Sequence, residues 1–234
     1  MKIAIGTKIQ SGPWGGGNQF AVNLTKYLEK EGHFVTNNLT DKNLDVILLT
    51  EPRKTSETST FNHKDIIKYK KYINNDVTVF HRINECDERK NTNYMNKFII
   101  EANKSSDVTI FVSSWLKNLY LKLGIKKENL HVIMAGADGE VFNNQNFQPW
   151  IEGQKIKLVT HHWSNNWNKG FEVYKKIDEL LGEELFNSHF EFTFIGRLPD
   201  NFEFKNVSKI NPLSGENLVK ELKKNDFYIT GTIN

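Results

Sequence analysis

Short apolar runs alternate with longer amphipathic stretches along the first part of the chain. Each run is bounded by polar residues or glycine and has the length and composition of a β-strand. Between the runs, apolar positions recur with the helical period, so that Phe20, Leu24 and Leu28 share one face. The predicted strands are Lys2–Gly6, Leu44–Leu49, Val77–His81, Val108–Val112 and His131–Met134, and the predicted helices are Asn18–Glu31, His63–Ile73, Tyr94–Lys104 and Ser114–Leu123.

A polar connection without periodicity, Val141–Gln154, interrupts this alternation, which then resumes. Strands that alternate with helices pair in parallel and bury both faces, so the sequence predicts an α/β fold with two doubly wound parallel sheets. We expect a first domain over 1–145, a linker over 146–154 and a second domain over 155–234. No helix follows the last strand to cover it, which predicts an incomplete second domain. Its predicted elements are strands Lys155–His161, Phe190–Gly196, Val207–Ile210 and Phe227–Thr230, and helices Phe171–Leu185 and Gly215–Lys224.

Composition narrows the class of protein. With 38% hydrophobic and 25% charged residues in 234, the chain is globular. Its 31 basic and 28 acidic side chains leave a dispersed net charge of +3, which predicts no nucleic-acid partner. It lacks a long apolar span and a secretory signal, so the expected location is the cytoplasm, with a peripheral position at the membrane as the alternative. The single Cys86 excludes an internal disulfide and is expected to be buried.

Three consecutive glycines separate the first predicted strand from the first predicted helix. Gly15, Gly16 and Gly17 allow close approach of a ligand and lead into a helix N-terminus, where N–H groups favour an anion. Together with Asn18 they are candidates for binding phosphate or sugar hydroxyls; a surface loop without a ligand is the alternative. The loop matches neither G-x-G-x-x-G nor the Walker A pattern, which argues against a nicotinamide-dependent oxidoreductase.

Polar and charged residues gather where the third predicted strand ends. Open α/β sheets bind ligands at this edge, so His81, Arg82 and Glu85 are candidates for contacting sugar hydroxyls or orienting a substrate. We expect Arg82 and Glu85, with Trp14, on the acceptor or sugar side. The alternative is a solvated loop whose charged side chains pair with one another.

The strand that opens the second domain is followed by a polar loop and a lysine. Lys169 near a helix start, with Ser164 and Asn165 before it, suits a nucleotide diphosphate, because an ammonium group and helix amides attract its charge. Gly196 and Arg197, at the next strand's end, are weaker candidates for the same phosphates. Packed tryptophans with a surface lysine are the alternative.

The sequence contains no motif typical of a metal site or of a catalytic nucleophile. His161 and His162 are adjacent on a predicted strand and point to opposite faces, so they are not expected to chelate one metal. The chain has no Asp-x-Asp pair, no G-x-S-x-G and no H-E-x-x-H. We therefore expect metal-independent binding without a cofactor.

These motifs, in this order, resemble retaining glycosyltransferases of family 4, which have the GT-B fold. They are the glycine-rich loop, His81 at a strand exit, D-V-T-I-F-V-S-S-W-L over 107–116, G-A-D-x-x-x-F over 136–142, and a strand-loop-Lys-Gly-helix opening the second domain. The resemblance runs from Lys2 to Ile229. It implies two Rossmann-like domains facing across a cleft, with the acceptor bound mainly by the first and a nucleotide sugar mainly by the second.

The resemblance also implies roles for individual residues. Gly15, Gly16 and Gly17 match the loop that lines the cleft beside the donor phosphates and the acceptor. His81 matches a histidine near the transferred sugar and is the candidate catalytic residue. Lys169 matches the lysine of an R-x-x-x-x-K pair that neutralises the diphosphate leaving group, as fixed cations can do where no metal is used.

The implied activity is metal-independent transfer of a hexosyl group, with retention, from a nucleotide diphosphate sugar, which is a co-substrate, to a carbohydrate, lipid or protein-linked acceptor. Two departures favour an alternative, a non-catalytic sugar- or nucleotide-binding fragment or relative. Ser164 stands where the family has arginine, and the family's E-x-x-x-x-x-x-x-E segment would lie beyond Asn234. The uncovered last strand also predicts self-association through the second domain, with coverage by a partner chain as the alternative.

Overall fold

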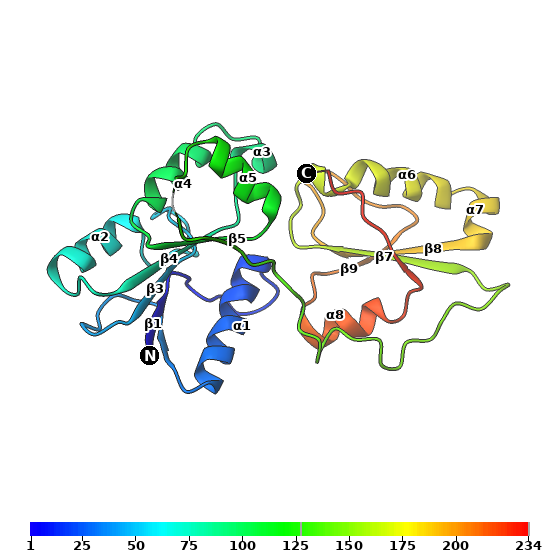
Figure 1. Cartoon of the computed structure of the whole chain (residues 1–234). Coiled ribbons are helices and arrows are strands. Elements are labelled where there is room, and N and C mark those ends of the chain that lie inside the picture. Colours follow the sequence, from blue (N-terminus) through cyan, green and yellow to red (C-terminus); the bar gives the residue numbers. More distant parts are fainter. Residues whose placement is uncertain (127, 234) are drawn as a thin grey trace. The chain divides into compact units, whose positions relative to one another are not determined.

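The computed structural model describes residues 1–126 and 128–233. The chain divides into two compact units, Met1–Gly136 and Ala137–Asn234. Each unit has a sheet and a core of its own (Figure 1). The two are described separately below.

The first unit is built on a parallel sheet. Its strands in the described residues are β1 (Lys2–Ile5), β2 (Phe34–Thr36), β3 (Val46–Leu49), β4 (Thr78–Ile83), β5 (Val108–Phe111) and β6 (Leu130–Val132). Its helices there are α1 (Gly16–Lys30), α2 (His63–Tyr72), α3 (Asp87–Lys90), α4 (Met95–Asn103) and α5 (Ser114–Lys122). The strands lie in the order β2-β1-β3-β4-β5-β6 and every pair is parallel, as predicted.

Helices cover both faces of this sheet (Figure 1). Ala21 of α1 packs with Ile3, Ile5 and Leu48 on one face. Helices α2, α4 and α5 pack on the other face, where the core includes buried Ile66, Ile99 and Tyr120 and the sheet residues beneath them. Because successive residues of a strand point to opposite faces, neighbouring residues of β4 serve the two different cores.

The second unit repeats this design with fewer strands. Its elements in the described residues are β7 (Ile156–His162), η1 (Trp167–Lys169), α6 (Phe171–Leu181), α7 (Glu184–His189), β8 (Phe190–Gly196), β9 (Ser208–Ile210), α8 (Gly215–Leu222) and β10 (Phe227–Tyr228). The strand order is β10-β7-β8-β9, again all parallel. Helix α6 packs on one face through Phe171 and Tyr174, and Leu218 of α8 packs on the other.

Several elements differ from those predicted. The edge strand β2 and the one-turn helix α3 were not expected. The helix expected over Phe171–Leu185 ends at Leu181 and is followed by a separate α7, because Gly182 caps α6. Strand β4 continues to Ile83, two residues beyond the predicted end, so its polar residues belong to the strand itself.

The lengths of the helices show whether any of them could span a membrane. The longest described helix, α1, has 15 residues. No helix in the described part of the chain is long and apolar enough to span a bilayer. The thiol of Cys86 is buried in the first unit, as predicted.

Candidate functional site

Each sheet has a point at which the direction of strand addition reverses. In the first unit β1 lies between β2 and β3, and in the second β7 lies between β8 and β10. Loops that leave neighbouring strands there diverge to opposite faces and leave a crevice at the carboxyl edge of the sheet. Ligands of open α/β sheets bind in such crevices, so both carboxyl edges are the places to look for a site.

The glycine-rich loop reaches the carboxyl edge of the first unit. Gly15 is the N-cap of α1, and Gly16 and Gly17 form its first turn, without a capping side chain among the described residues. The space where a Cβ would stand on Gly16 or Gly17 is open. The Asn18 side chain is held by Gln10, whose backbone N–H donates to Oδ1 at 2.8 Å and whose carbonyl accepts from Nδ2 at 3.0 Å. Asn18 therefore shapes the loop, and the glycines leave room for a ligand.

Arg82 lies on the face of β4 that is covered by α1. Its guanidinium carbon is 3.9 Å from the centroid of the Phe20 ring, a cation–π contact. The residue is 7% exposed, and burial lowers the pKa of its guanidinium. No ion pair or hydrogen bond of the guanidinium occurs within the described residues.

His81 lies on the opposite face of β4 and is 1% exposed. Its Nδ1 is 3.1 Å from Nδ2 of Asn103 at the end of α4, and the same Nδ2 donates to Oγ1 of Thr109 at 2.8 Å. The histidine is thus tied into a polar cluster between the sheet and α4. Its catalytic role stays a prediction.

An arginine between two carboxylates was missed by the sequence analysis. Nη2 of Arg53 lies 2.6 Å from a carboxylate oxygen of Glu51, after β3, and 3.0 Å from one of Glu85, after β4. The Glu51 carboxylate raises the pKa of Arg53. These three side chains connect the loops that follow β3 and β4. Glu85 was a candidate from the sequence, but no local pattern links it to Glu51 and Arg53, about thirty positions earlier.

In the second unit, the loop after β7 forms a compact cap before α6. Oγ of Ser164 accepts from the Asn166 N–H at 3.2 Å, and Oδ1 of Asn166 accepts from the Asn168 N–H at 3.0 Å. These short-range bonds shape the turn that leads into η1, which ends with Lys169. Asn165 is exposed in the same loop. Ser164 therefore accepts a hydrogen bond from the loop backbone, at the position where glycosyltransferases of family 4 have an arginine.

The segment after β10 holds this loop. The Ile233 N–H donates to the Asn168 carbonyl at 2.9 Å, and Oγ1 of Thr232 donates to the Lys169 carbonyl at 3.4 Å. A Cβ on Gly170, whose φ is +101°, would lie 2.6 Å from the backbone of Gly231. Two glycines at this crossing allow the backbones to touch, and the contact fixes the turn that carries Lys169.

Tyr174 and His162 connect the loop to the core. The buried Tyr174 hydroxyl lies 2.7 Å from Nε2 of His162 and accepts from the Gly231 N–H at 3.2 Å. Burial, with smaller contributions from His161 and Lys169, lowers the pKa of His162 to about 4. His162 is therefore neutral at pH 7 and supports the site as a hydrogen-bonding group.

Stability should consequently fall in acid. Between pH 6.5 and about 4 the unfolded chain binds a proton at His162 that the folded chain does not, so the stabilisation is complete above pH 6.5 and is lost as the pH falls toward 4. We expect the melting temperature to drop from pH 7 to pH 5 by less in His162→Gln than in the unsubstituted protein. His131→Gln, at an exposed position, is the control. Equal pH dependence in the unsubstituted protein and His162→Gln would contradict the assignment.

Gly196 and Arg197 follow β8, the neighbour of β7. Gly196 has φ +153°, and a Cβ there would lie 2.2 Å from the carbonyl oxygen of His162. The exposed Arg197 places its guanidinium carbon 3.8 Å from the centroid of the Trp163 ring. The glycine thus serves the close approach of the two strand ends, and the arginine lies beside the loop that follows β7.

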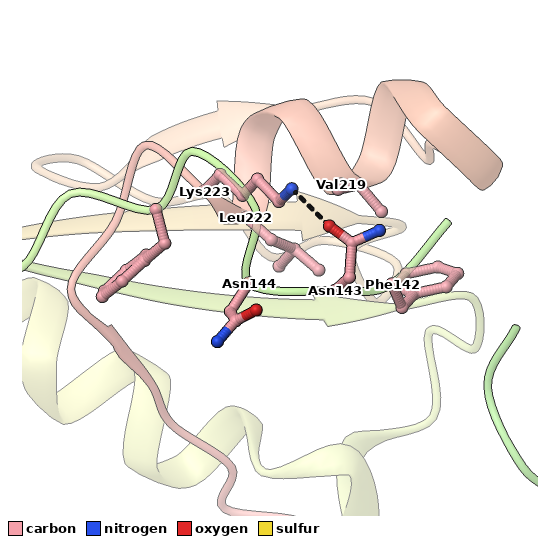
Figure 2. A pocket seen from close by; sticks show the side chains of 7 residues that line it. Phe142, Asn143, Asn144, Val219, Leu222 and Lys223 are labelled. Atoms are coloured by element: carbon pink, nitrogen blue, oxygen red, sulfur yellow. Dashed lines mark hydrogen bonds between the residues drawn. The ribbon is translucent and has the colours of Figure 1, made fainter. Parts of the chain in front are cut away.

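A pocket of about 390 Å³ in the second unit lies elsewhere. The connection 142–147 lines it together with the end of α8, and Nζ of Lys223 donates to Oδ1 of Asn143 at 3.1 Å (Figure 2). The same Nζ also donates to the Gln145 carbonyl at 2.7 Å. Helix α8 precedes β10, so its last residues lie at the amino edge of the sheet. The pocket is therefore separate from the candidate site.

Comparisons with known proteins give the fold. No protein-family model and no curated protein sequence matches the chain. An α-glucosyltransferase in complex with UDP and a 13-mer DNA containing an HMU base superposes with a TM-score of 0.61 at 13% identity, over 100% of this chain and 73% of that one. The fold is of the GT-B type. A second structure, an α-glucosyltransferase with UDP-glucose and DNA containing an abasic site, gives a TM-score of 0.58 at 12% identity over the same shares of each chain.

A third solved structure, apo OtsA, matches 89% of this chain and 54% of its own at a TM-score of 0.50 and 11% identity. The GT-B fold confirms the predicted pair of Rossmann-like domains.

One prediction was wrong: the small net charge was taken to exclude a nucleic-acid partner, yet two structures with this fold contain DNA. A net count over the whole chain averages out local charge, and therefore excludes no such partner.

The structure thus gathers the predicted residues into two groups. Gly15 to Asn18 form the start of α1, and Arg82 contacts Phe20 of the same helix, while His81 faces the opposite side of the sheet. Trp14 lies just before this helix. Lys169, Ser164 and Asn165 share one loop, and Gly196 and Arg197 lie at the adjoining strand end.

Proposed function

We propose that the protein is a glycosyltransferase that binds a nucleotide diphosphate sugar at the carboxyl edge of its second unit. The observation that carries this proposal is the placement of two cations. Lys169 follows β7 and Arg197 follows β8, and these strands pair in parallel up to His162 and Gly196. Both cations therefore leave the same edge of the sheet, beside the reversal point at β7 where a ligand of this fold is expected.

Transfer of a sugar from a nucleotide diphosphate requires cations of this kind. When the bond between the anomeric carbon and the diphosphate oxygen breaks, its electron pair stays on the diphosphate, and the acceptor oxygen bonds to the carbon and loses its proton. An ammonium and a guanidinium stabilise the growing negative charge in the way a metal does in other enzymes. We propose metal-independent transfer with retention, as the resemblance to family 4 implies. His81 is retained as the candidate residue near the transferred sugar.

We propose a wider range of acceptors than the carbohydrate, lipid or protein-linked ones expected from the sequence. Two α-glucosyltransferases of the same fold are solved with DNA. An acceptor hydroxyl on a nucleic acid therefore belongs in the proposal, and DNA with a hydroxymethylated base is the first acceptor to test.

Donor binding is tested by thermal shift. Among UDP-, GDP- and ADP-sugars, we expect those of one nucleotide to raise the melting temperature, because a ligand that binds only the folded state stabilises it by mass action. Release of the nucleoside diphosphate, with and without acceptor and against a boiled control, then measures turnover. Unchanged melting temperatures with all three classes at millimolar concentration would refute the proposal.

A second candidate function is non-catalytic recognition of a nucleotide sugar. Ser164 favours it, because its hydroxyl accepts the Asn166 N–H and brings no positive charge to the position where the resemblance has arginine. A thermal shift with a nucleotide but no release of nucleoside diphosphate would select this candidate. Release that depends on an acceptor would select the transferase.

A further inference from the structure

The pocket between the connection 142–147 and the end of α8 has the size of a small-molecule site. Its volume is about 390 Å³, and all of its lining residues belong to the second unit. Sites for small ligands typically measure roughly 300–1,000 Å³. A cavity of roughly 150 Å³ already holds one benzene molecule. The pocket therefore has room for a bicyclic ring with a short side chain.

The walls of this pocket are largely apolar. Phe142 and Phe147 come from the connection, and Val219 and Leu222 come from α8. The two phenylalanines are 38% and 41% exposed, so neither is enclosed in the core of the unit. Covering exposed aromatic surface with an apolar group is favourable, and a flat ring can pack edge-to-face or offset on phenylalanine. The walls therefore favour a ligand with an aromatic ring.

The connection that carries these rings has a defined backbone. The Phe142 N–H donates to the Asp138 carbonyl at 2.7 Å, and the Phe147 N–H donates to the Asn144 carbonyl at 3.1 Å. Each bond closes a tight turn at a phenylalanine. A ligand would not have to order this segment on binding, which removes one of the usual entropic costs.

A lysine supplies the positive charge of the pocket. Nζ of the half-buried Lys223 donates to Oδ1 of Asn143, the bond drawn in Figure 2, and to the Gln145 carbonyl. Both acceptors are neutral, and this ammonium forms no ion pair in the part of the chain that the structure describes. A lysine ammonium has three N–H donors, so one is left for a ligand. A carboxylate would accept from it and supply the missing counter-charge.

We propose that this pocket binds a small aromatic carboxylate. The ring packs against Phe142, Phe147 and Leu222, and the carboxylate accepts a hydrogen bond from Nζ of Lys223. Such a ligand contacts both the connection and α8, and so stabilises the packing of one on the other. The pocket lies at the amino edge of the sheet, whereas the Lys169 loop leaves the carboxyl edge, so this proposal does not rest on the proposed function.

Three probes separate the two halves of the recognition. Naphthylacetate carries both a ring and a charge, naphthylacetamide has the same ring without the charge, and acetate has the charge without the ring. In NMR titrations that follow the backbone amides, we expect naphthylacetate to bind at least about tenfold more tightly than either of the others. The amides that shift should lie in 142–147 and 219–223.

Replacing Lys223 tests the charge. Lys223→Met keeps the apolar stem, so naphthylacetate affinity should fall about tenfold, to that of naphthylacetamide, whose own affinity should not change. Lys223→Gln keeps an N–H donor for the connection and should lose the same preference. Lys220→Met is the matched control, because this exposed lysine of α8 does not line the pocket. Equal loss of both ring-bearing probes in Lys223→Met would mean that Lys223 only braces the connection, and would overturn its role in binding.

Replacing a ring tests the apolar part. Phe147→Ala should weaken naphthylacetate and naphthylacetamide alike, because both lose the same aromatic surface. Acetate that binds as tightly as naphthylacetate would reduce the pocket to an unspecific anion site. Shifts confined to 162–170 and 196–197 would place the probes at the carboxyl edge instead. Either result, or a preference for the carboxylate that survives in Lys223→Met, would overturn the proposal.

Discussion

Replacing Lys169 by alanine is expected to abolish the rise in melting temperature that the nucleotide sugar causes and to lower sugar transfer by about 100-fold or more. The loop that carries Lys169 is braced by its own polar side chains and by the segment after β10, through Ile233 and Thr232. A cation held in place before the reaction stabilises a diphosphate that gains charge in the transition state, and loss of one such group typically costs about 10²–10³ in rate. Thermal shift and release of nucleoside diphosphate measure the two effects.

The matched control is Lys175→Ala, which removes an exposed lysine from the adjoining helix α6. It should leave both the thermal shift and the rate unchanged. Arg197→Ala should weaken nucleotide binding less than Lys169→Ala, because the exposed Arg197 is held mainly by its stacking on Trp163. A Lys169→Ala variant whose melting temperature still rises fully with the nucleotide sugar would remove the phosphate role from this loop.

Much of the fold was predictable because its signals are local. Apolar runs and helical periods predict most of the elements in both units, and their alternation predicts parallel pairing. The misses have physical causes. Strand β2 is a three-residue edge strand, too short for a period to show. In β4, His81 and Arg82 are polar residues on opposite faces, so the strand looked finished before Ile83.

The candidate site was less predictable because its contacts join distant parts of the chain. The glycine-rich loop and Lys169 were found from local sequence alone. The pairing of Arg53 with Glu85 spans 32 positions, and the contact between Gly170 and Gly231 brings together two loops that no motif connects. Such contacts depend on which strands are neighbours, which only the folded sheet determines.

The wrong prediction about a nucleic-acid partner also arose because the sequence does not show which side chains lie together. A net charge of +3 says nothing about where individual charges meet. Arg53 is neutralised by two carboxylates, whereas Arg82, from the next strand, is buried against an aromatic ring without an acid beside it in the described residues. Anion binding is decided by such local imbalance, which counting side chains cannot reveal.

Gly196→Ala is expected to destabilise the protein by about 3 kcal/mol or more. The added Cβ would lie 2.2 Å from the His162 carbonyl oxygen, and the φ of +153° disfavours any residue with a side chain. Strands β7 and β8 would have to separate at the end that carries the Lys169 loop. Steric overlap with backbone cannot be relieved by a rotamer change, so both clash and strain contribute. Chemical denaturation measures the loss of stability, and nucleotide binding should weaken with it.

Gly17→Ala is the matched control, because this glycine lies in a helix with open space where its Cβ would stand. The same substitution there should be neutral or stabilise the protein by up to about 1 kcal/mol, since alanine loses less conformational entropy than glycine on folding. The difference between the two variants isolates the approach of Gly196 to His162 from the general effect of adding a methyl group. Equal stabilities would mean that the strand ends can separate freely, and that close approach of β7 and β8 is not what positions the cations after them.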